Sequence, residues 1–362
     1  MGNMGMTVPD GDFWKGRRVL LTGHTGFKGG WLACWLKQLQ VELYGYALPP
    51  WTDPNLYTCL KLPYAGEEIG DLRVPGRISE FVKTARPEIV FHLAAQPLVR
   101  RSYRDPVETF TTNILGTVNL LQALRHVNSL KAVLVVTSDK AYDNCSNSEH
   151  RLSRLFQEND PLGGNDPYSA SKAAQEIVTR SFAQSFFRDP NIPVATARAG
   201  NVIGGGDWSE DRLMTDVLQA VSENVPIRLR AAKSTRPWQH VLEPLAGYLL
   251  YVEALVAGRV NERALNFGPC RSHQVMEVVD IILTHYPDNS GWVEETSPDP
   301  EAEALALDPS RAMAALGWKT RLTLKEALNM VVRWHKAHAA GEDVFAATLE
   351  QIACYEKVLR KP

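Results

Sequence analysis

The chain has 362 residues, 44% of them hydrophobic, with 39 lysines and arginines against 41 aspartates and glutamates. A chain of this length and apolar content builds a large core, which excludes a disordered or fibrous protein. Its charges nearly cancel and it has no basic run of five or more residues, so a small molecule is expected as partner rather than nucleic acid or a membrane.

The cysteines and the amino-terminal segment predict a cytoplasmic protein. No pair of cysteines has the C-x-x-C spacing, which is typical of a reduced chain without structural zinc, and no metal site is expected. The first 18 residues lack the apolar core of a signal peptide, and no later run reaches the length that spans a bilayer. We interpret the five cysteines as packing residues: Cys34, Cys59, Cys145, Cys270 and Cys354.

Strand-like and helix-like segments alternate over the first 200 residues. The expected strands cover 17–23, 41–48, 87–95, 132–138 and 192–200, and the expected helices cover 29–40, 74–85, 106–126 and 168–187. Such alternation predicts an α/β protein with a Rossmann-like, doubly wound parallel sheet and helices on both faces.

After residue 200 the alternation weakens and turn-rich stretches appear, followed by a helix expected over 324–339. We therefore expect a dinucleotide-binding domain over 1–200 and a smaller α/β substrate domain over 201–362. Part of 238–270 is expected to return to the first domain, where it adds strands to the sheet and makes both domains discontinuous.

The first strand ends in a loop with three glycines spaced three residues apart, Gly23, Gly26 and Gly29. Glycines at a strand-to-helix junction let backbone N–H groups approach a pyrophosphate, and the helix dipole favours the negative charge. A plain glycine-rich turn is the alternative. The loop residues expected to bind a dinucleotide are Gly23, His24, Thr25, Gly26, Phe27, Lys28 and Gly29; for His24 and Lys28 a solvated loop position is an equal alternative.

The acidic residue that usually binds the ribose hydroxyls of NAD is missing. It should follow the glycines by roughly 20 residues, at the end of the second strand, but Ala47 stands there, and no arginine is nearby to receive the extra phosphate of NADP. This part of the sequence alone leaves the choice between NAD and NADP open.

Tyr168 and Lys172 are four residues apart in an expected helix, so both side chains lie on one face. A neighbouring lysine cation lowers the pKa of a tyrosine and lets the phenolate act as a base near neutral pH. Ser138, at the tip of a buried strand, supplies a hydroxyl that can hold an alcohol oxygen, and Asp139 and Lys140 follow it directly. An isolated tyrosine–lysine pair is more often an ordinary surface helix, but this one follows the glycine loop and the buried strand in order.

Three short segments in order, the G-x-x-G-x-x-G loop, "GDL" at 70–72 and "HLAAQ" at 92–96, resemble the extended short-chain dehydrogenase/reductase superfamily. The resemblance implies that Asp71 contacts the adenine amino group and that Asn113 supports the site. The further cofactor contacts it implies are Leu72, Leu93, Ala94, Ala95, Tyr168 and Lys172.

Within that superfamily the chain resembles the nucleotide-sugar 4,6-dehydratases, which typically have Asp-Glu after the strand-tip hydroxyl. Here the pair is Asp139 and Lys140, and "TSDK-x-Y" at 137–142 is similar to the branch that acts on CDP-glucose. Longer segments also resemble that branch, among them "GHTGFKGGWL", "FHLAAQPLVRRSY" and "GGNDPYSASKAAQE". The resemblance implies a hydro-lyase that retains NAD, with Asp139 as general acid and Lys140 as base or supporting group.

The same resemblance implies a CDP-glucose site and a role in deoxysugar and surface-polysaccharide synthesis. Its expected contacts are Gln96, Arg100, Asn201, Arg212, Arg236 and His240, where Arg212 and Arg236 pair with phosphate and His240 lies with Glu243 at the start of a helix. Trp208 and Trp238 either shape the pocket or only pack. A homodimer through helices beside the Tyr168 helix is expected, alone or paired into a tetramer.

Three alternatives remain at this point: a dehydratase for another nucleotide, a 4-epimerase, and a non-catalytic dinucleotide sensor. Retention of Ser138, Tyr168 and Lys172 argues against the sensor.

Overall fold

The computed structural model describes residues 8–143, 155–189, 191–295 and 306–361. Its centre is a seven-stranded sheet in the order β11-β6-β5-β4-β1-β2-β3, in which every neighbouring pair is parallel. The strands are β1 Arg18–Thr22, β2 Glu42–Ala47, β3 Gly66–Ile69, β4 Ile89–His92, β5 Ala132–Val136, β6 Val194–Ala199 and β11 Ala264–Phe267. The predicted Rossmann-like fold class is confirmed.

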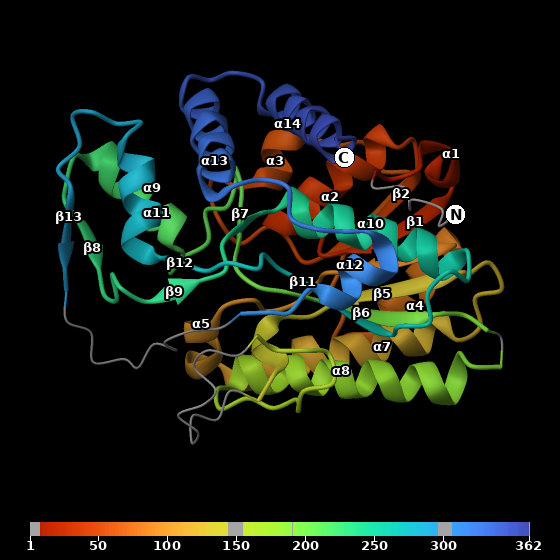
Figure 1. Ribbon diagram of the computed structural model, residues 1–362. Coiled ribbons are helices and arrows are strands. Elements are labelled where there is room, and N and C mark those ends of the chain that lie inside the picture. The colour runs from red at the N-terminus through yellow and green to blue at the C-terminus, as the bar shows by residue number, and fades with distance from the viewer. Residues whose placement is uncertain (1–7, 144–154, 190, 296–305, 362) are drawn as a thin grey trace.

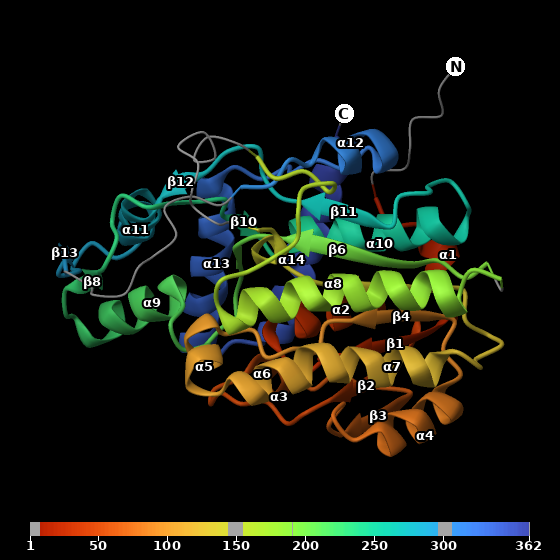
Figure 2. The same ribbon diagram turned by 90° about the horizontal axis from the view of Figure 1, so that it is seen from below.

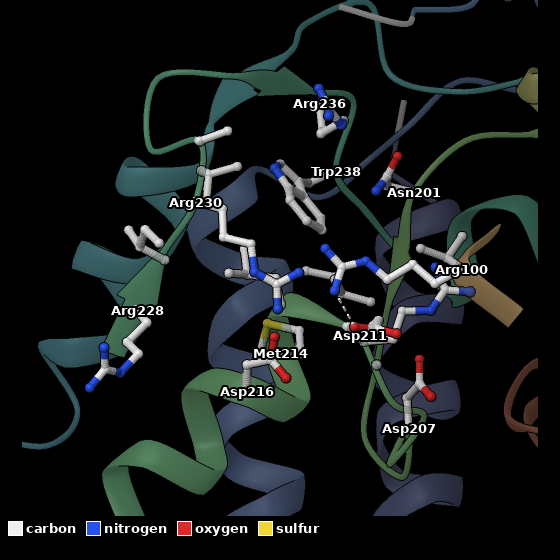
Figure 3. A pocket seen from close by; sticks show the side chains of 18 residues that line it. Arg100, Asn201, Asp207, Asp211, Met214, Asp216, Arg228, Arg230, Arg236 and Trp238 are labelled. Atoms are coloured by element: carbon white, nitrogen blue, oxygen red, sulfur yellow. Dashed lines mark hydrogen bonds and ion pairs between the residues drawn. The ribbon is translucent and has the colours of Figure 1, made fainter. Parts of the chain in front are cut away.

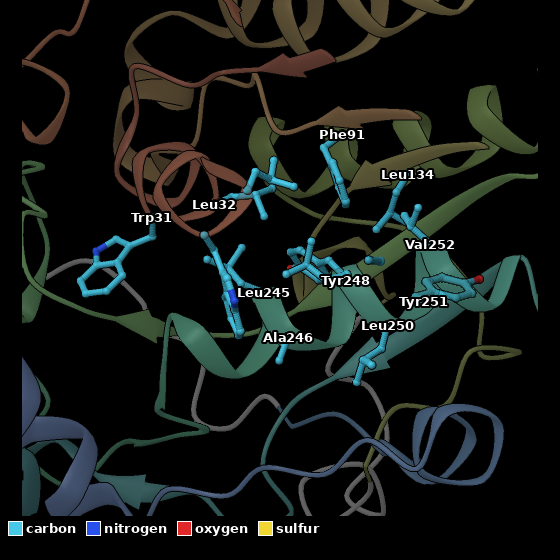
Figure 4. Close-up of a cluster of buried hydrophobic side chains, with 14 of the residues drawn as sticks. Trp31, Leu32, Phe91, Leu134, Leu245, Ala246, Tyr248, Leu250, Tyr251 and Val252 are labelled. Carbon is cyan, nitrogen blue, oxygen red and sulfur yellow. The ribbon is translucent and has the colours of Figure 1, made fainter. Parts of the chain in front are cut away.

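Helices cover both faces of the sheet (Figure 1). On one face lie α4 Pro75–Ala85, α7 Gly116–Leu124 and α8 Pro167–Phe186; on the other lie α2 Phe27–Gln38 and α10 Leu242–Val256, with α14 Val344–Leu359 packed outside α2. Figure 4 shows side chains of α2 and α10, among them Leu32, Leu245 and Tyr248, packed together beside Phe91 and Leu134 of the central strands. Strand β5 is buried along its whole length and is apolar without alternation, as expected of the buried strand that precedes Ser138.

A smaller group of elements lies to one side of the sheet (Figures 1 and 2). This group has its own apolar core. Its elements are α9 Leu213–Glu223, β8 Ile227–Leu229, α11 Val275–Leu283, β13 Trp292–Glu294 and α13 Leu324–Ala339. Strand β11, between these segments in the chain, pairs with β6 in the main sheet. A domain boundary at residue 200 stays a prediction.

Two local features differ from the expected elements. The helix expected over 106–126 is divided into α6 Pro106–Phe110, a π-helical turn Thr111–Leu115 and α7. His240 lies on the two-residue strand β10 Gln239–His240, and α10 begins only at Leu242. The remaining short elements are α1 Gly11–Trp14, α3 Leu56–Leu60, α5 Val99–Arg104, a 3-10 turn Asp139–Ala141, β7 Val202–Ile203, β9 Thr235–Arg236, β12 His273–Gln274 and α12 Ser310–Leu316.

Four of the five cysteines lie in the described ranges, and all four are free thiols. Cys34 is buried and Cys59 half-buried, but Cys270 and Cys354 are exposed, so the interpretation as packing residues is wrong for these two. Cys145 lies outside the described residues. Within the described ranges, no helix combines the length and apolar character required to cross a bilayer.

Candidate active site

The glycine loop brings the end of β1, the end of β4 and the first turn of α2 into close contact. Gly23 has a φ of +78°, which favours glycine, and a Cβ atom on it would lie 2.6 Å from the Ala94 nitrogen. A Cβ on Gly29 would lie 2.1 Å from the Gly23 carbonyl oxygen. Because Gly26 caps α2 without a side chain, the first N–H groups of this 12-residue helix stay open to an anion. The loop therefore fits a dinucleotide pyrophosphate.

The side chains of the loop point in different directions. His24 is buried, its Nε2–H donates to Glu67 Oε1 of β3 at 2.7 Å, and its ring packs edge-on against Tyr64, so it holds the loop against β3. The Thr25 hydroxyl donates to the Leu48 carbonyl over 2.8 Å. The Phe27 ring lies against Gly204, since a Cβ atom on that glycine would be 2.9 Å from the ring.

The predicted adenine end of the site contains a paired carboxylate. Asp71 accepts from the Arg73 backbone nitrogen at 2.8 Å and from its guanidinium. Although partial burial raises the pKa of Asp71, these bonds and the Arg73 charge hold it below its usual value. Leu72 is buried, whereas Leu93, Ala94 and Ala95, which follow β4, are partly exposed, as expected of residues beside a cofactor. Direct contacts of Asp71 with adenine stay a prediction.

Ser138 and Asp139 lie where β5 ends. Ser138 caps the 3-10 turn, and its hydroxyl donates to Asp139 Oδ1 at 2.9 Å; the Lys140 backbone nitrogen donates to the same Oδ1 at 2.9 Å. A Cβ on Gly200 would lie 3.0 Å from Asp139 Oδ2, so a glycine at that position leaves this oxygen room. Two hydrogen bonds thus hold Oδ1, and the glycine at 200 leaves space beside Oδ2.

Burial raises the pKa of Asp139, against the opposing effects of the Lys140 charge, the Ser138 hydrogen bond and the Lys28 charge. The side chain is 4% exposed. A carboxyl with a raised pKa is protonated over a wider pH range and can donate a proton. Lys140 itself is half-buried and lies close enough to act on Asp139 electrostatically.

Tyr168 and Lys172 lie in the first turns of α8, both buried. The Lys172 ammonium donates to the Val136 carbonyl at 3.4 Å and to Gln175 Oε1 at 3.0 Å. Burial and the positive charge of Lys28 lower the pKa of Lys172 to about 7. The structure thus brings Tyr168 and Lys172 beside the tip of β5, where Ser138 and Asp139 lie.

The electrostatics around Tyr168 differ from the expected pattern. Burial raises its pKa to about 12, and the groups that oppose this increase are the Ser138 hydroxyl and the Arg212 guanidinium. Arg212 also acts on Lys28, whose pKa burial lowers to about 8. Sequence analysis expected Arg212 at the phosphates. In the structure its positive charge also acts on Tyr168 and opposes the increase in the pKa of that phenol.

Asn113 and Gln96 have their side chains engaged within the protein. Asn113 lies in the π-helical turn; its amide nitrogen donates to Ser171 Oγ at 2.8 Å and to the Gln96 carbonyl at 3.2 Å, and its oxygen accepts from the Gln96 nitrogen at 2.8 Å. The Gln96 amide nitrogen donates to Leu98 and Thr109. These bonds tie the loop after β4 to α8, and direct contact of either side chain with a ligand stays a prediction.

A pocket of about 210 Å³ opens between the main sheet and the smaller group of elements (Figure 3). Its lining brings together four of the predicted substrate residues, Arg100, Asn201, Arg212 and Arg236, and also Trp238. Arg100 forms an ion pair with Asp211 over 2.8 Å. An arginine-rich pocket of this kind suits a phosphorylated ligand.

Sequence analysis missed five charged residues of this pocket, the arginines Arg228 and Arg230 and the aspartates Asp207, Asp211 and Asp216. The two arginines flank buried Leu229 on strand β8, and the alternation in "IRLR" at 227–230 is the signal that could have found them. Figure 3 shows Arg230 and Asp216 directed toward the middle of the pocket.

Two predicted residues lie away from the pocket. His240 is fully buried, packs edge-on against Trp31 with ring centroids 5.6 Å apart, and burial lowers its pKa to about 3. Trp208 packs among Trp334, His335 and His338, so the packing alternative holds for it. Neither ring lines the pocket.

The fold and the glycine loop together define a dinucleotide-binding protein. Residues 19–268 match the NAD dependent epimerase/dehydratase family, and the chain belongs to this family. Over 356 residues the chain is 43% identical to the CDP-glucose 4,6-dehydratase of Salmonella typhimurium, covering 96% of this chain and 98% of that enzyme. It is 26% identical over 345 residues to the dTDP-glucose 4,6-dehydratase of Xanthomonas campestris, covering 87% and 92% of the two chains.

Solved structures show the same fold. An epimerase from Methanothermobacter thermautotrophicus has a TM-score of 0.80 at 22% identity and covers 94% of this chain and 98% of that one. The dTDP-glucose 4,6-dehydratase of Bacillus anthracis, solved in complex with NAD, has a TM-score of 0.74 at 19% identity and covers 91% and 99%. The family resemblance predicted from the sequence is confirmed.

Proposed function

We propose that this chain is an NAD-dependent CDP-glucose 4,6-dehydratase, which converts CDP-glucose to CDP-4-keto-6-deoxyglucose and releases water. The observation that supports it best is the buried acid Asp139, which accepts a hydrogen bond from Ser138 and whose pKa is raised by burial. A 4-epimerase eliminates no water and needs no such acid. The 43% identity to the Salmonella enzyme supports the same reaction and CDP-glucose as the substrate.

The first step requires a base at the 4-hydroxyl of the sugar. We assign this base to Tyr168, with Ser138 holding the same oxygen, Arg212 supplying positive charge, and Lys172, one turn along α8, as a second cation. Bound NAD would supply a hydride acceptor for carbon 4 and a hydride donor for carbon 6. Because the unliganded phenol has a pKa of about 12, the positive charges around it must stabilise the phenolate during turnover.

The second step removes the proton from carbon 5 and the hydroxyl from carbon 6. We assign protonation of the leaving hydroxyl to Asp139, through Oδ2, since Oδ1 already accepts from Ser138 and Lys140. Lys140 is the candidate for the proton at carbon 5 or for orienting the substrate. Exchange of the carbon 5 proton with deuterated solvent, compared between the native chain and Lys140→Met, separates these two roles, because exchange requires a base at carbon 5 and should be lost if Lys140 is that base.

The nucleotide diphosphate is assigned to the pocket of Figure 3. Arg236, Arg212 and the newly found Arg230 can pair with phosphate oxygens, and Asn201 can donate to another. Since Arg212 also lies near Tyr168, the sugar is expected at that end of the pocket and the nucleoside toward β8.

The assembly proposed is a homodimer in the cytoplasm. Apolar side chains are exposed on α6, on the turn after it and on α8: Val107 at 70%, Leu115 at 48% and Ile177 at 49%. A face of this kind favours association. Sedimentation of the native chain and of Ile177→Asp tests it, because a dimer through this face should dissociate in the variant.

Product mass for a panel of nucleoside-diphosphate glucoses tests the proposed reaction. The purified chain should release water from CDP-glucose and use the UDP and dTDP compounds much more slowly. A product of unchanged mass indicates an epimerase, and binding without any product indicates a dinucleotide sensor. Preference for another nucleotide would retain the dehydratase but contradict the assignment of CDP-glucose.

A further inference from the structure

The hydrogen bonds of Lys172 depend on a residue outside the Tyr168–Lys172 pair. Lys172 is 3% exposed, and its ammonium group donates to Gln175 Oε1, three residues along α8, at 3.0 Å. The bond to the Val136 carbonyl is longer, at 3.4 Å. In the described part of the chain, Gln175 is the one side chain that accepts a hydrogen bond from this ammonium group.

The nearest acid along the helix is engaged elsewhere. Both oxygens of Glu176 accept from the Arg198 guanidinium, at 2.9 and 2.7 Å, and they also accept from the hydroxyls of Thr137 and Thr196. Glu176 and Arg198 are each 4% exposed and form a buried ion pair. Glu176 therefore balances Arg198, and its charge acts on Lys172 only from a distance.

A chain of hydrogen bonds fixes the orientation of the Gln175 amide. Its nitrogen donates to Thr117 Oγ1 at 2.8 Å. Because the Thr117 hydroxyl donates to the Asn113 carbonyl at 2.7 Å, its lone pairs accept from Gln175 and from His92 Nε2 at 2.9 Å. His92 Nδ1 then accepts from the Thr22 hydroxyl at 2.7 Å. With its nitrogen committed to Thr117, Gln175 can present only its oxygen to Lys172.

His92 is a neutral member of this chain. Burial and the charge of Lys172 lower its pKa to about 3, and its two ring nitrogens act as one donor and one acceptor. Every hydrogen bond along the path from Thr22 to Lys172 therefore has a defined donor and acceptor. The orientation of the amide does not vary with pH in the neutral range.

We propose that Gln175 is a positioning residue that keeps the Lys172 ammonium group charged and in place beside Tyr168. The inference rests on the proposed roles of that pair. Lys172 is buried among other charges, and a fixed carbonyl dipole offsets part of the cost of burying a cation. The ionisable groups that interact electrostatically with Lys172 are Lys28 of α2, His92 of β4 and Glu176 of α8, and Tyr168 lies one turn before it on the same helix.

The direct test measures the titration of Lys172 by NMR. The full-length chain is labelled with carbon-13 at the lysine ε-carbon, and the chemical shift of that carbon is recorded against pH. The Lys172 signal is assigned from its loss in Lys172→Met. Gln175→Leu, which removes the acceptor at similar volume, should lower the titration midpoint by about one pH unit. Gln175→Glu should raise it, because a carboxylate stabilises the cation more than an amide does.

The matched control is Gln184→Leu, the same substitution at an exposed position of the same helix. It should leave the midpoint unchanged. An unchanged midpoint in Gln175→Leu with a folded chain would overturn the inference, and so would equal shifts in both leucine variants.

Kinetics provide a second test. The high-pH decline of kcat/KM should move to lower pH in Gln175→Leu, with a loss of about tenfold at the alkaline side, and Gln175→Glu should restore the rate there. A uniform loss at every pH would contradict a positioning role. If the native chain releases no water from any nucleoside-diphosphate glucose while the NMR midpoint still shifts, the proposed reaction fails and the inference about Lys172 stands.

Discussion

Replacement of Asp139 by asparagine tests the elimination step. The two side chains have nearly the same shape, and the donors that hold Oδ1, the Ser138 hydroxyl and the Lys140 backbone nitrogen, both at 2.9 Å, can bond the asparagine oxygen equally. The amide nitrogen then occupies the position of Oδ2 toward Gly200. The fold should be unaffected, but the variant has no acidic proton for the leaving hydroxyl.

General acid catalysis contributes roughly 100- to 10,000-fold to a reaction rate, so kcat for water release should fall within that range. Hydride transfer from carbon 4 does not use Asp139 and should continue. Rapid mixing with CDP-glucose should therefore show the absorbance of reduced nicotinamide rise and persist, whereas in the native chain it should rise only transiently.

The control for this prediction is Asp288→Asn, an exposed acid far along the chain from the site. A second readout is pH, because burial raises the pKa of Asp139 and its protonated form is lost as pH rises through that value. The native elimination rate should fall at alkaline pH. Water release at the native rate by Asp139→Asn would refute the acid assignment.

Three further predictions concern the pocket and the fold. Gly200→Ala, whose methyl would lie 3.0 Å from Asp139 Oδ2, should reduce kcat several-fold at an unchanged melting temperature, whereas Gly76→Ala, with nothing within 4 Å, should have no effect on kcat. Arg230→Met should raise KM for CDP-glucose about tenfold or more with kcat little changed, as measured by steady-state kinetics, if β8 lies at the nucleotide. Burial raises the pKa of Glu243 to about 7, so the folded state binds this proton more tightly than the unfolded state does. The free energy of unfolding should therefore decrease as pH rises from 4.5 to 7. Chemical denaturation of Glu243→Gln should show a weaker decrease.

Much of the fold follows from local patterns in the sequence. Fully buried strands such as β5 appear as continuous apolar runs, and the helices between them have their own periodicity. The π-helical turn at Asn113 is invisible to such patterns, because the hydrogen bonds of Asn113 to Gln96 and Ser171, which connect it to the loop after β4 and to α8, join separate elements.

The candidate site divides in the same way. Gly23, Ser138 and Tyr168 have local signals, namely a glycine spacing, a strand tip and a helical spacing to a lysine. The proximity of Arg212 to Tyr168 has no such signal, since the two residues are 44 positions apart and only the tertiary fold brings the Arg212 charge to act on Tyr168. The burial of His240 is likewise set by its contact with Trp31 of α2, distant in the chain.

The measurement that tests the account most directly follows the fate of a deuterium placed at carbon 4 of CDP-glucose. The proposed reaction predicts a product lighter by one water, with the deuterium found at carbon 6 of the same molecule. Deuterium retained at carbon 4 in a product of unchanged mass, or lost to solvent, would contradict it.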